Sequence, residues 1–293
     1  MKKITIGLND GGQRADKFIQ KAFPKLPTAL MYKAFRKKDV KVNGKWIKES
    51  VFLTEGDELS IYLPDDCFGE KNFKPVDDNI SVIYEDENII IIDKEKGVPC
   101  QAGQDGKTPL CDMLKSYLYN RKEFIPENEK SFSPALCNRI DTNTVGLVIG
   151  AKNAAALRAM NEAIRNREVK KYYLCETEGM PPKNEGEVRV HLTKNKSENK
   201  MYVSSEGEAT LTYYKVLEKT KSGAKVEIDL KTGKSHQIRA VMAHLGCPLT
   251  GDGKYGAKTH GGQKLISYKL SFAITAPLLS YLNEKTFYSK HTL

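Results

Sequence analysis

The sequence contains no apolar run close to the roughly 20 residues that a membrane-spanning helix requires. Its start, MKKITIGLND, is basic but lacks the sustained apolar core of a signal peptide. The six cysteines are scattered, without a C-x-x-C pair or histidines at zinc spacing, which excludes a disulfide framework and favours reduced, mostly buried thiols. A Gly-rich phosphate-binding loop is also missing. We therefore expect a soluble, cytoplasmic protein without a membrane partner, a metal or a small-molecule cofactor.

Charge is the first positive indication of function. The chain of 293 residues carries a net charge of +10 and has a pI near 9.1, and a basic surface attracts polyanions such as nucleic acids. Residues 1–63 contain 13 Lys or Arg against 7 Asp or Glu, whereas residues 64–80 contain 5 acids against 2 bases and two prolines. This length and this change in composition predict a small basic domain, a linker and one larger domain.

The N-terminal segment has the pattern of two helices followed by strands. RADKFIQKAF and PTALMYKAFRKK each place apolar residues on one helical face, and in the second segment Lys33, Arg36 and Lys37 share another face. VKVNGKWI predicts a hairpin around Asn43 and Gly44, and TEGDELSIYL predicts a further strand. On charge alone, the basic face is explained equally well as a solvated surface or as a binding surface for phosphates.

From residue 80 onward the pattern predicts an α+β domain on a largely antiparallel sheet with flanking helices. ISVIYEDENIIIIDK reads as two strands, and KTPLCDMLKSYLYN as a helix with Thr108 at the N-cap and Pro109 at its first position. KKYYLCETEG, GEVRVHL, ATLTYYKVL and AKVEIDL are strand candidates, several with alternating polarity. KSHQIRAVMAHLG predicts a short helix that ends at Gly246.

Three polar segments interrupt these elements. NRIDTNTVG either turns the chain or holds a working carboxylate, Asp141, beside the guanidinium of Arg139. In KKYYLCETEG, Tyr173 is either a half-buried strand aromatic or a platform for a substrate. In KTGKSHQIRA, Arg239 is either a surface charge or a partner for a carboxylate, and His236 is either a structural hydrogen-bonding group or a catalytic acid. Taken one at a time, each segment is better explained as structural.

Taken together, the segments resemble a known enzyme family. NRIDTNTVGLVIGAKN, KKYYLCETEG and TGKSHQIRAVMAHLGCPLTGDGKYG occur in the order and approximate spacing of the RluA family of pseudouridine synthases. Residues 13–63 resemble the alpha-L RNA-binding module first known from a small-subunit ribosomal protein. The chain from about residue 13 to about residue 275 is thus similar to the RluC/RluD-type branch. The resemblance implies an RNA-binding domain at 1–63, a linker at 64–79 and a catalytic domain at 80–293.

The resemblance also implies roles for individual residues. Asp141 matches the catalytic aspartate, and Arg239 matches the residue that keeps it ionised and oriented. Tyr173 matches the aromatic that packs against the target base, and Arg139 the arginine that fills the space left by the flipped nucleotide. The RNA phosphate contacts expected of the N-terminal module are Lys33, Arg36, Lys37 and Lys41.

Two positions depart from the family pattern. Asn138 stands where the family usually has His, and Val145 stands where it usually has Ser. Neither position is that of the nucleophile, so the departures do not exclude activity, but they put the expected contacts around the flipped nucleotide in question.

The leading hypothesis is an RNA pseudouridine synthase that acts as a monomer on large-subunit ribosomal RNA. The alternative is a non-catalytic RNA-binding or ribosome-assembly protein on a synthase scaffold, which the joint presence of Asp141, Tyr173 and Arg239 disfavours. A phosphodiesterase or glycosidase using Asp141 with His236 is a third hypothesis. It is weaker because such enzymes normally need a metal cluster or a second carboxylate at a defined distance.

Overall fold

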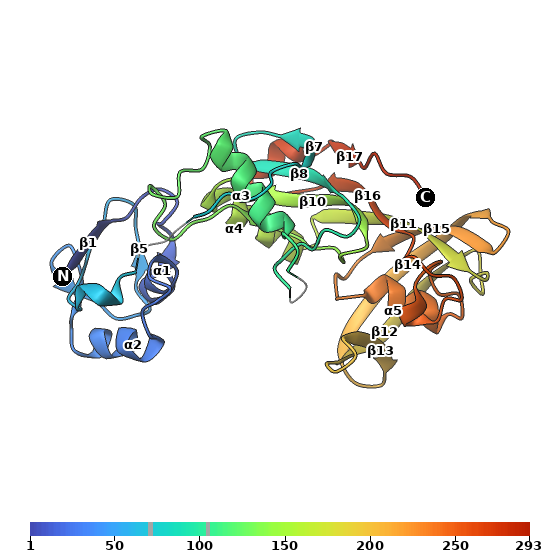
Figure 1. Ribbon diagram of the computed structural model, residues 1–293, viewed down its shortest axis with the longest axis horizontal. Coiled ribbons are helices and arrows are strands. Elements are labelled where there is room, and N and C mark those ends of the chain that lie inside the picture. Colours follow the sequence, from blue (N-terminus) through green and yellow to red (C-terminus); the bar gives the residue numbers. More distant parts are fainter. Residues whose placement is uncertain (70–72, 104–105) are drawn as a thin grey trace.

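A computed structural model describes residues 1–69, 73–103 and 106–293 of the chain. It has a small N-terminal lobe and a larger lobe that contains most of the strands (Figure 1). The small lobe encloses its own apolar core, which draws on residues from Ile4 to Phe68, while the cores of the larger lobe begin at Phe73. No helix of the described residues is long and apolar enough to span a bilayer.

The small lobe packs two helices on one face of a four-stranded antiparallel sheet ordered β1-β6-β3-β4. Asn43 and Gly44 both have positive φ, as a tight turn between β3 and β4 requires, so the predicted hairpin is confirmed. The elements are β1 (Lys2–Thr5), β2 (Gln13–Arg14), α1 (Ala15–Ala22), α2 (Thr28–Arg36), β3 (Val40–Val42), β4 (Lys45–Trp46), β5 (Phe52–Leu53) and β6 (Glu58–Ile61).

The larger lobe is built on one 11-stranded sheet. Nine of its strands are hydrogen-bonded in the order β13-β12-β14-β15-β11-β16-β10-β8-β7, while β17 pairs with β16 and β9 pairs with β10. All of its pairs are antiparallel except β10 with β16, which confirms the predicted α+β class. The strands are β7 (Ser81–Glu85), β8 (Ile89–Lys94), β9 (Ala135–Leu136), β10 (Val145–Ala151), β11 (Val169–Glu178), β12 (Glu185–Asn195), β13 (Lys200–Ser204), β14 (Glu208–Lys219), β15 (Gly223–Leu230), β16 (Leu265–Phe272) and β17 (Thr286–Tyr288).

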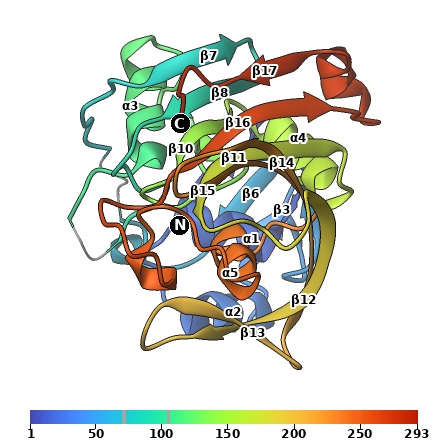
Figure 2. The same ribbon diagram turned by 90° about the vertical axis from the view of Figure 1, so that its right-hand side faces the viewer.

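Helices cover both faces of this sheet. α3 (Leu110–Asn120) and α5 (Gln237–His244) share a core with one face, and α4 (Ala154–Arg165) shares a core with the other. The run of four isoleucines in β8 follows from this arrangement, because alternate side chains enter the two cores and both faces are buried. Figure 2 shows β12 and β13 passing beside α5, against which they pack at the edge of the sheet.

The predicted N-cap of α3 is wrong. The helix begins at Leu110, Pro109 occupies the cap position in an extended conformation, and Thr108 lies outside. The free N–H groups of the first turn find other acceptors, because Leu110 N donates to Pro99 O at 2.8 Å and Cys111 N donates to the next carbonyl at 3.2 Å. A neighbouring chain segment therefore satisfies this helix start in place of a capping side chain.

The two lobes meet through polar contacts. Ser131 of the larger lobe donates from both N and Oγ to Asp10 Oδ1, at 2.8 and 2.7 Å, and the Asp10 side chain is buried. Ala154 N, at the start of α4, donates to Asn9 Oδ1 at 3.1 Å. The loop between β1 and β2 thus provides a hydrogen-bond acceptor for one of the free N–H groups at the start of α4 in the other lobe.

The expected linker is anchored at both ends. Phe68 packs edge to face on Phe23 of the small lobe, and Phe73 packs on an aromatic ring of α3 in the larger lobe. Residues 70–72 of this segment lie outside the described residues. Each described end thus belongs to the core of a different lobe.

Gly146 allows the parallel pair at the centre of the sheet to form. Its φ is +107°, and a Cβ at this position would lie 2.3 Å from Ser267 O on β16. β10 therefore approaches β16 more closely than any residue with a side chain permits.

We predict that Gly146→Ala lowers the free energy of unfolding by at least about 1 kcal/mol, because it adds a backbone clash to an unfavourable φ. Gly256→Ala is the matched control, since Gly256 also has a positive φ of +97° but no atom within 4 Å of the added Cβ. Urea denaturation of both variants gives the comparison. Equal destabilisation of the two would show that the clash with Ser267 is relieved without cost.

Candidate active site

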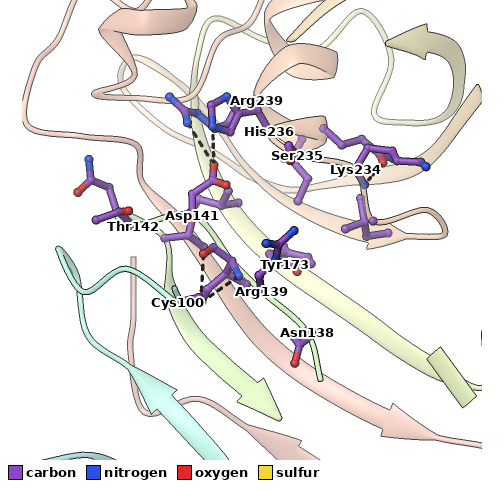
Figure 3. Close-up of a pocket in the computed structure, with 18 of the residues that line it drawn as sticks. Cys100, Asn138, Arg139, Asp141, Thr142, Tyr173, Lys234, Ser235, His236 and Arg239 are labelled. Atoms are coloured by element: carbon purple, nitrogen blue, oxygen red, sulfur yellow. Dashed lines mark hydrogen bonds and ion pairs between the residues drawn. The ribbon is translucent and has the colours of Figure 1, made fainter. Parts of the chain in front are cut away.

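The segment that carries Asp141 is a turn between β9 and β10, so the structural explanation of NRIDTNTVG holds for the backbone. Thr144 N donates to Asp141 O at 3.0 Å and closes the turn. Ile140 is buried, and its N and O both contact the thiol of Cys100, at 3.5 and 3.4 Å. This anchoring leaves the Asp141 side chain 26% exposed at a cavity (Figure 3).

Lys94, at the end of β8, fixes the other side of this turn. Its ammonium group is fully buried and donates to three backbone carbonyls, those of Glu95, Val98 and Thr142, at 2.8, 2.8 and 3.0 Å. Burial lowers the pKa of Lys94 to about 8, although the nearby thiol of Cys100 and the Asp141 carboxylate oppose this shift. Since Thr142 follows Asp141 directly, Lys94 positions the backbone beside the candidate catalytic carboxylate.

Arg239 is the cation that contacts Asp141. It lies in the first turn of α5, is 7% exposed, and donates from Nη1 to Asp141 Oδ2 at 3.1 Å. Its Nε and Nη2 donate to the two carboxylate oxygens of Asp252, each at 2.7 Å. Burial lowers the pKa of Arg239, but hydrogen bonds and charges from Asp252 and Asp141 outweigh it, so the pKa is raised overall. Arg239 therefore stays charged and bridges two carboxylates.

Asp252 and Tyr255 were missed as site residues by the sequence analysis. Asp252 is 2% exposed and holds the guanidinium in the bidentate geometry that carboxylates favour. The Arg239 guanidinium lies 4.8 Å from the centre of the Tyr255 ring, and Tyr255 Oη accepts from Met201 N on β13 at 2.9 Å. Both residues belong to the GDGKYG segment, whose carboxylate and aromatic were the available signal.

His236 has a structural role in this arrangement. It adopts a left-handed backbone conformation at the start of α5, with φ of +51°, and its Nδ1 lies 3.0 Å from Tyr255 Oη. Its Nε2 is 3.9 Å from Asp141 Oδ2, which is beyond hydrogen-bonding distance. Burial lowers the pKa of His236, and the charge of Arg239 lowers it further. The Asp141 carboxylate raises this pKa but does not offset the other effects, so the ring is neutral near pH 7.

Tyr173 lines the same cavity from β11. The strand pairing shifts register on β16 between Tyr172 and Tyr173, so that Tyr173 is opposite Ser267. The Tyr173 side chain is 5% exposed, and burial raises its pKa to about 12, so it remains a neutral phenol at physiological pH. An uncharged aromatic at the cavity wall suits contact with a flat base.

Arg139 lies at the exposed edge of the cavity and donates to the side-chain oxygen of Gln101. The idea that Arg139 accompanies Asp141 is therefore wrong for the described structure, in which Arg239 makes that contact. Of the two departures from the family pattern, Asn138 accepts from Ile149 N at 2.8 Å and holds β10. Val145 is the first residue of the same strand.

The cavity has a volume of about 830 Å³ and a basic rim. Lys171, Lys194, Lys234 and Lys254 line it together with Arg139. Lys254 donates to Asn199 O at 2.8 Å, and burial lowers the pKa of Lys171. A polar cavity of this charge fits a nucleotide with its phosphates.

The N-terminal candidates lie apart from this cavity, in the small lobe. Lys33 and Arg36 are exposed on α2, Lys37 is exposed at the C-cap of α2, and Lys41 is half-buried on β3. In the described parts of the chain, no cluster of three or more His, Cys, Asp or Glu side chains could hold a metal ion. All six cysteines are free thiols.

Comparison with known proteins identifies the family. Residues 88–244 match the RNA pseudouridylate synthase family. The chain is 30% identical over 298 residues to an RNA pseudouridine synthase of Mycoplasma capricolum described as uncharacterized, covering 97% of this chain and 96% of that protein. It is 33% identical over 273 residues to the ribosomal large subunit pseudouridine synthase C of Rickettsia bellii, covering 87% and 85%.

Among solved structures, human RNA pseudouridylate synthase domain containing 4 shares the fold, with a TM-score of 0.57 at 24% identity over 72% of this chain and 88% of that one. The buried Arg239 bridge, the polar cavity and these relatives agree with the motifs that predicted the RluA family. The chain therefore belongs to the RNA pseudouridylate synthase family and is a pseudouridine synthase.

Proposed function

We propose that this enzyme isomerises uridines of large-subunit ribosomal RNA and that Asp141 is its catalytic carboxylate. The observation that carries the catalytic assignment is the Asp141 side chain at the cavity, held at 3.1 Å by a guanidinium that Asp252 orients from behind. The choice of RNA is supported by the Rickettsia relative, whose name specifies the ribosomal large subunit. We propose that the enzyme acts as a monomer in the cytoplasm.

The reaction exchanges one bond to the ribose for another. The bond between uracil N1 and C1′ breaks, the base turns, a bond from C5 to C1′ forms, and the proton of C5 is replaced by one on N1. A carboxylate either attacks C1′ or removes a proton from the sugar, and the hydrogen bond from Arg239 orients Asp141 for both routes. Because the product is an isomer of the substrate, the reaction has no net redox change and needs no group donor. We therefore propose that neither a metal nor a cofactor takes part.

The remaining cavity residues bind the nucleotide in this proposal. Tyr173 packs against the uracil, a kind of contact worth about 1–3 kcal/mol for base stacking in general. The target nucleotide must leave its stack at a cost of a few kcal/mol, and Arg139, at the exposed edge, occupies the space it vacates. Lys171 reaches a backbone phosphate. In the described residues no hydrogen bond or ion pair occupies its ammonium group, which is therefore available.

In this proposal the two lobes have different functions, RNA binding and catalysis. Residues 1–63 form an RNA-binding domain, residues 64–79 link it, and residues 80–293 form the catalytic domain. The exposed cations of α2 support this proposal because they face solvent and not the core, which is formed by Met31, Ala34 and Phe35 on the same helix. Lys33, Arg36, Lys37 and Lys41 contact phosphates.

Asp141→Asn is expected to abolish isomerisation and to leave RNA affinity nearly unchanged, because the amide keeps the shape of the carboxylate but is neither a nucleophile nor a base. Tritium release from ribosomal RNA fragments labelled at uridine C5 measures turnover. Release by the variant at the wild-type rate would remove Asp141 from the mechanism. If the wild-type protein modifies other RNAs but no large-subunit fragment, the proposed substrate is wrong.

Asp252→Asn tests whether the second carboxylate positions the first. The amide nitrogen would face an N–H of Arg239, so we expect the guanidinium to turn and kcat to fall roughly 10- to 100-fold with a smaller change in KM. Asp229→Asn is the matched control, since Asp229 pairs with Lys231 at a partly exposed site. An unchanged kcat in Asp252→Asn would mean that Asp141 does not depend on this bridge.

Replacement of Lys33, Arg36 and Lys37 by Glu should weaken binding across RNA sequences, because phosphate contacts carry no base information. The dependence of log affinity on log salt should become shallower by about 0.7 for each phosphate of single-stranded RNA that the variant no longer neutralises. A variant with Lys17, Lys21 and Lys25 replaced by Glu has the same net charge and exposed sites, and serves as control. Equal salt slopes for the two triple variants would show that α2 does not contact the RNA.

A further inference from the structure

The four-stranded sheet of the small lobe has one face that no helix covers. Along β6, Leu59 and Ile61 enter the core with the helices, so Ser60 points to the opposite face. Directly paired residues of an antiparallel sheet project from the same face, and the register aligns Lys3, Ser60, Lys41 and Trp46 in one row across the four strands. Tyr62 lies two residues beyond Ser60. This face, on which Ser60 itself is only 4% exposed, is called the aromatic face below.

The aromatic face carries two exposed rings, each with a lysine over it. Trp46 is 51% exposed and Tyr62 is 43% exposed, unlike the core aromatics of this lobe. Lys38 Nζ lies 5.0 Å from the centre of the Trp46 ring, and Lys41 Nζ lies 5.0 Å from the centre of the Tyr62 ring. Single exposed aromatics are common on protein surfaces, but two exposed rings that each lie 5.0 Å from a lysine ammonium in one lobe form a specific arrangement.

The arrangement is continuous with the basic surface of α2. Lys38 follows Lys37 directly in the chain, has a φ of +63°, and extends to the Trp46 ring. Lys38 thus joins the end of α2, on one side of the sheet, to the aromatic face on the other side. Aromatic side chains set in a basic surface stack unpaired bases, whereas the bases of a duplex are hidden in their own stack.

We propose that the aromatic face binds unpaired bases of the RNA substrate, with Trp46 and Tyr62 as stacking platforms and Lys38 and Lys41 as contacts to the adjoining phosphates. This proposal rests on the proposed RNA-binding role of residues 1–63 and adds the class of ligand, single-stranded RNA. The small lobe thus recognises a loop or an unpaired strand at a site separate from the catalytic cavity.

Trp46 is the only tryptophan of the chain, so its fluorescence reports directly on the aromatic face. Full-length protein is titrated with an unstructured RNA strand of about ten nucleotides and with a blunt duplex of equal length. We expect the single strand to quench the fluorescence. The duplex should leave it unchanged although binding is visible by anisotropy of a label on the RNA.

Substitutions test the contribution to affinity. Trp46→Ala and Tyr62→Ala should each weaken binding of the single strand roughly 5- to 100-fold, and binding of the duplex should remain unchanged. Tyr62→Phe should bind like the wild type because it keeps the ring. Phe52→Ala is the matched control, since Phe52 is 65% exposed but lies on β5 in a separate two-stranded sheet. These side chains are exposed, so their removal leaves no core cavity.

The outcomes separate this inference from the proposed function. Salt-dependent binding of the single strand without quenching, or with unchanged affinity in Trp46→Ala, would overturn the aromatic face as an RNA site and would leave the α2 contacts in place. That result would indicate a protein partner for this surface. Equal RNA affinities of the wild type and the α2 triple variant would instead contradict the RNA-binding role of the small lobe itself.

Discussion

A buried guanidinium shared between two carboxylates is the interaction on which the active site depends. Removing one partner of such a buried pair typically costs about 3–5 kcal/mol, because the remaining charge stays out of water without compensation. Arg239 can therefore remain at the base of the cavity only while Asp252 holds it, and one of the three N–H groups that Asp252 leaves free donates to Asp141. Substituting Arg239 would leave Asp252 buried and unpaired, so it would disturb folding and chemistry together.

The backbone around Asp141 is fixed as firmly as its side chain. The Lys94 ammonium needs all three of its N–H donors for the three carbonyls around it, one of which belongs to Thr142. A few residues further on, Gly146 permits the close approach of β10 to β16. The polar run that interrupts two apolar segments is thus a turn and, in the proposed mechanism, also the catalytic segment, because a catalytic carboxylate must be preorganised on rigid supports.

Local sequence patterns predict well those elements whose structure depends on residues close together in the sequence. The alternation of β11 to β15, the Asn43-Gly44 turn and the apolar stripe of α5 each follow from nearby residues. The cap of α3 and the pairing of Asp252 with Arg239 were missed because their partners come from chain segments distant in sequence or from another element. Lys94 was missed for a related reason, since one of the three carbonyls that hold it belongs to Thr142, far along the chain.

The cavity alone cannot account for the selection of particular uridines. In the proposed mechanism every target presents the same uracil and ribose to Tyr173 and Asp141, so contacts inside the cavity cannot distinguish one uridine from another. Discrimination must come from surfaces that contact the RNA around the target. The buried Asp10 that joins the lobes through Ser131 gives the small lobe a defined orientation toward the cavity. If the small lobe binds an unpaired segment, as we propose, that segment sets which uridine reaches Asp141, by distance and direction and not by the identity of the base.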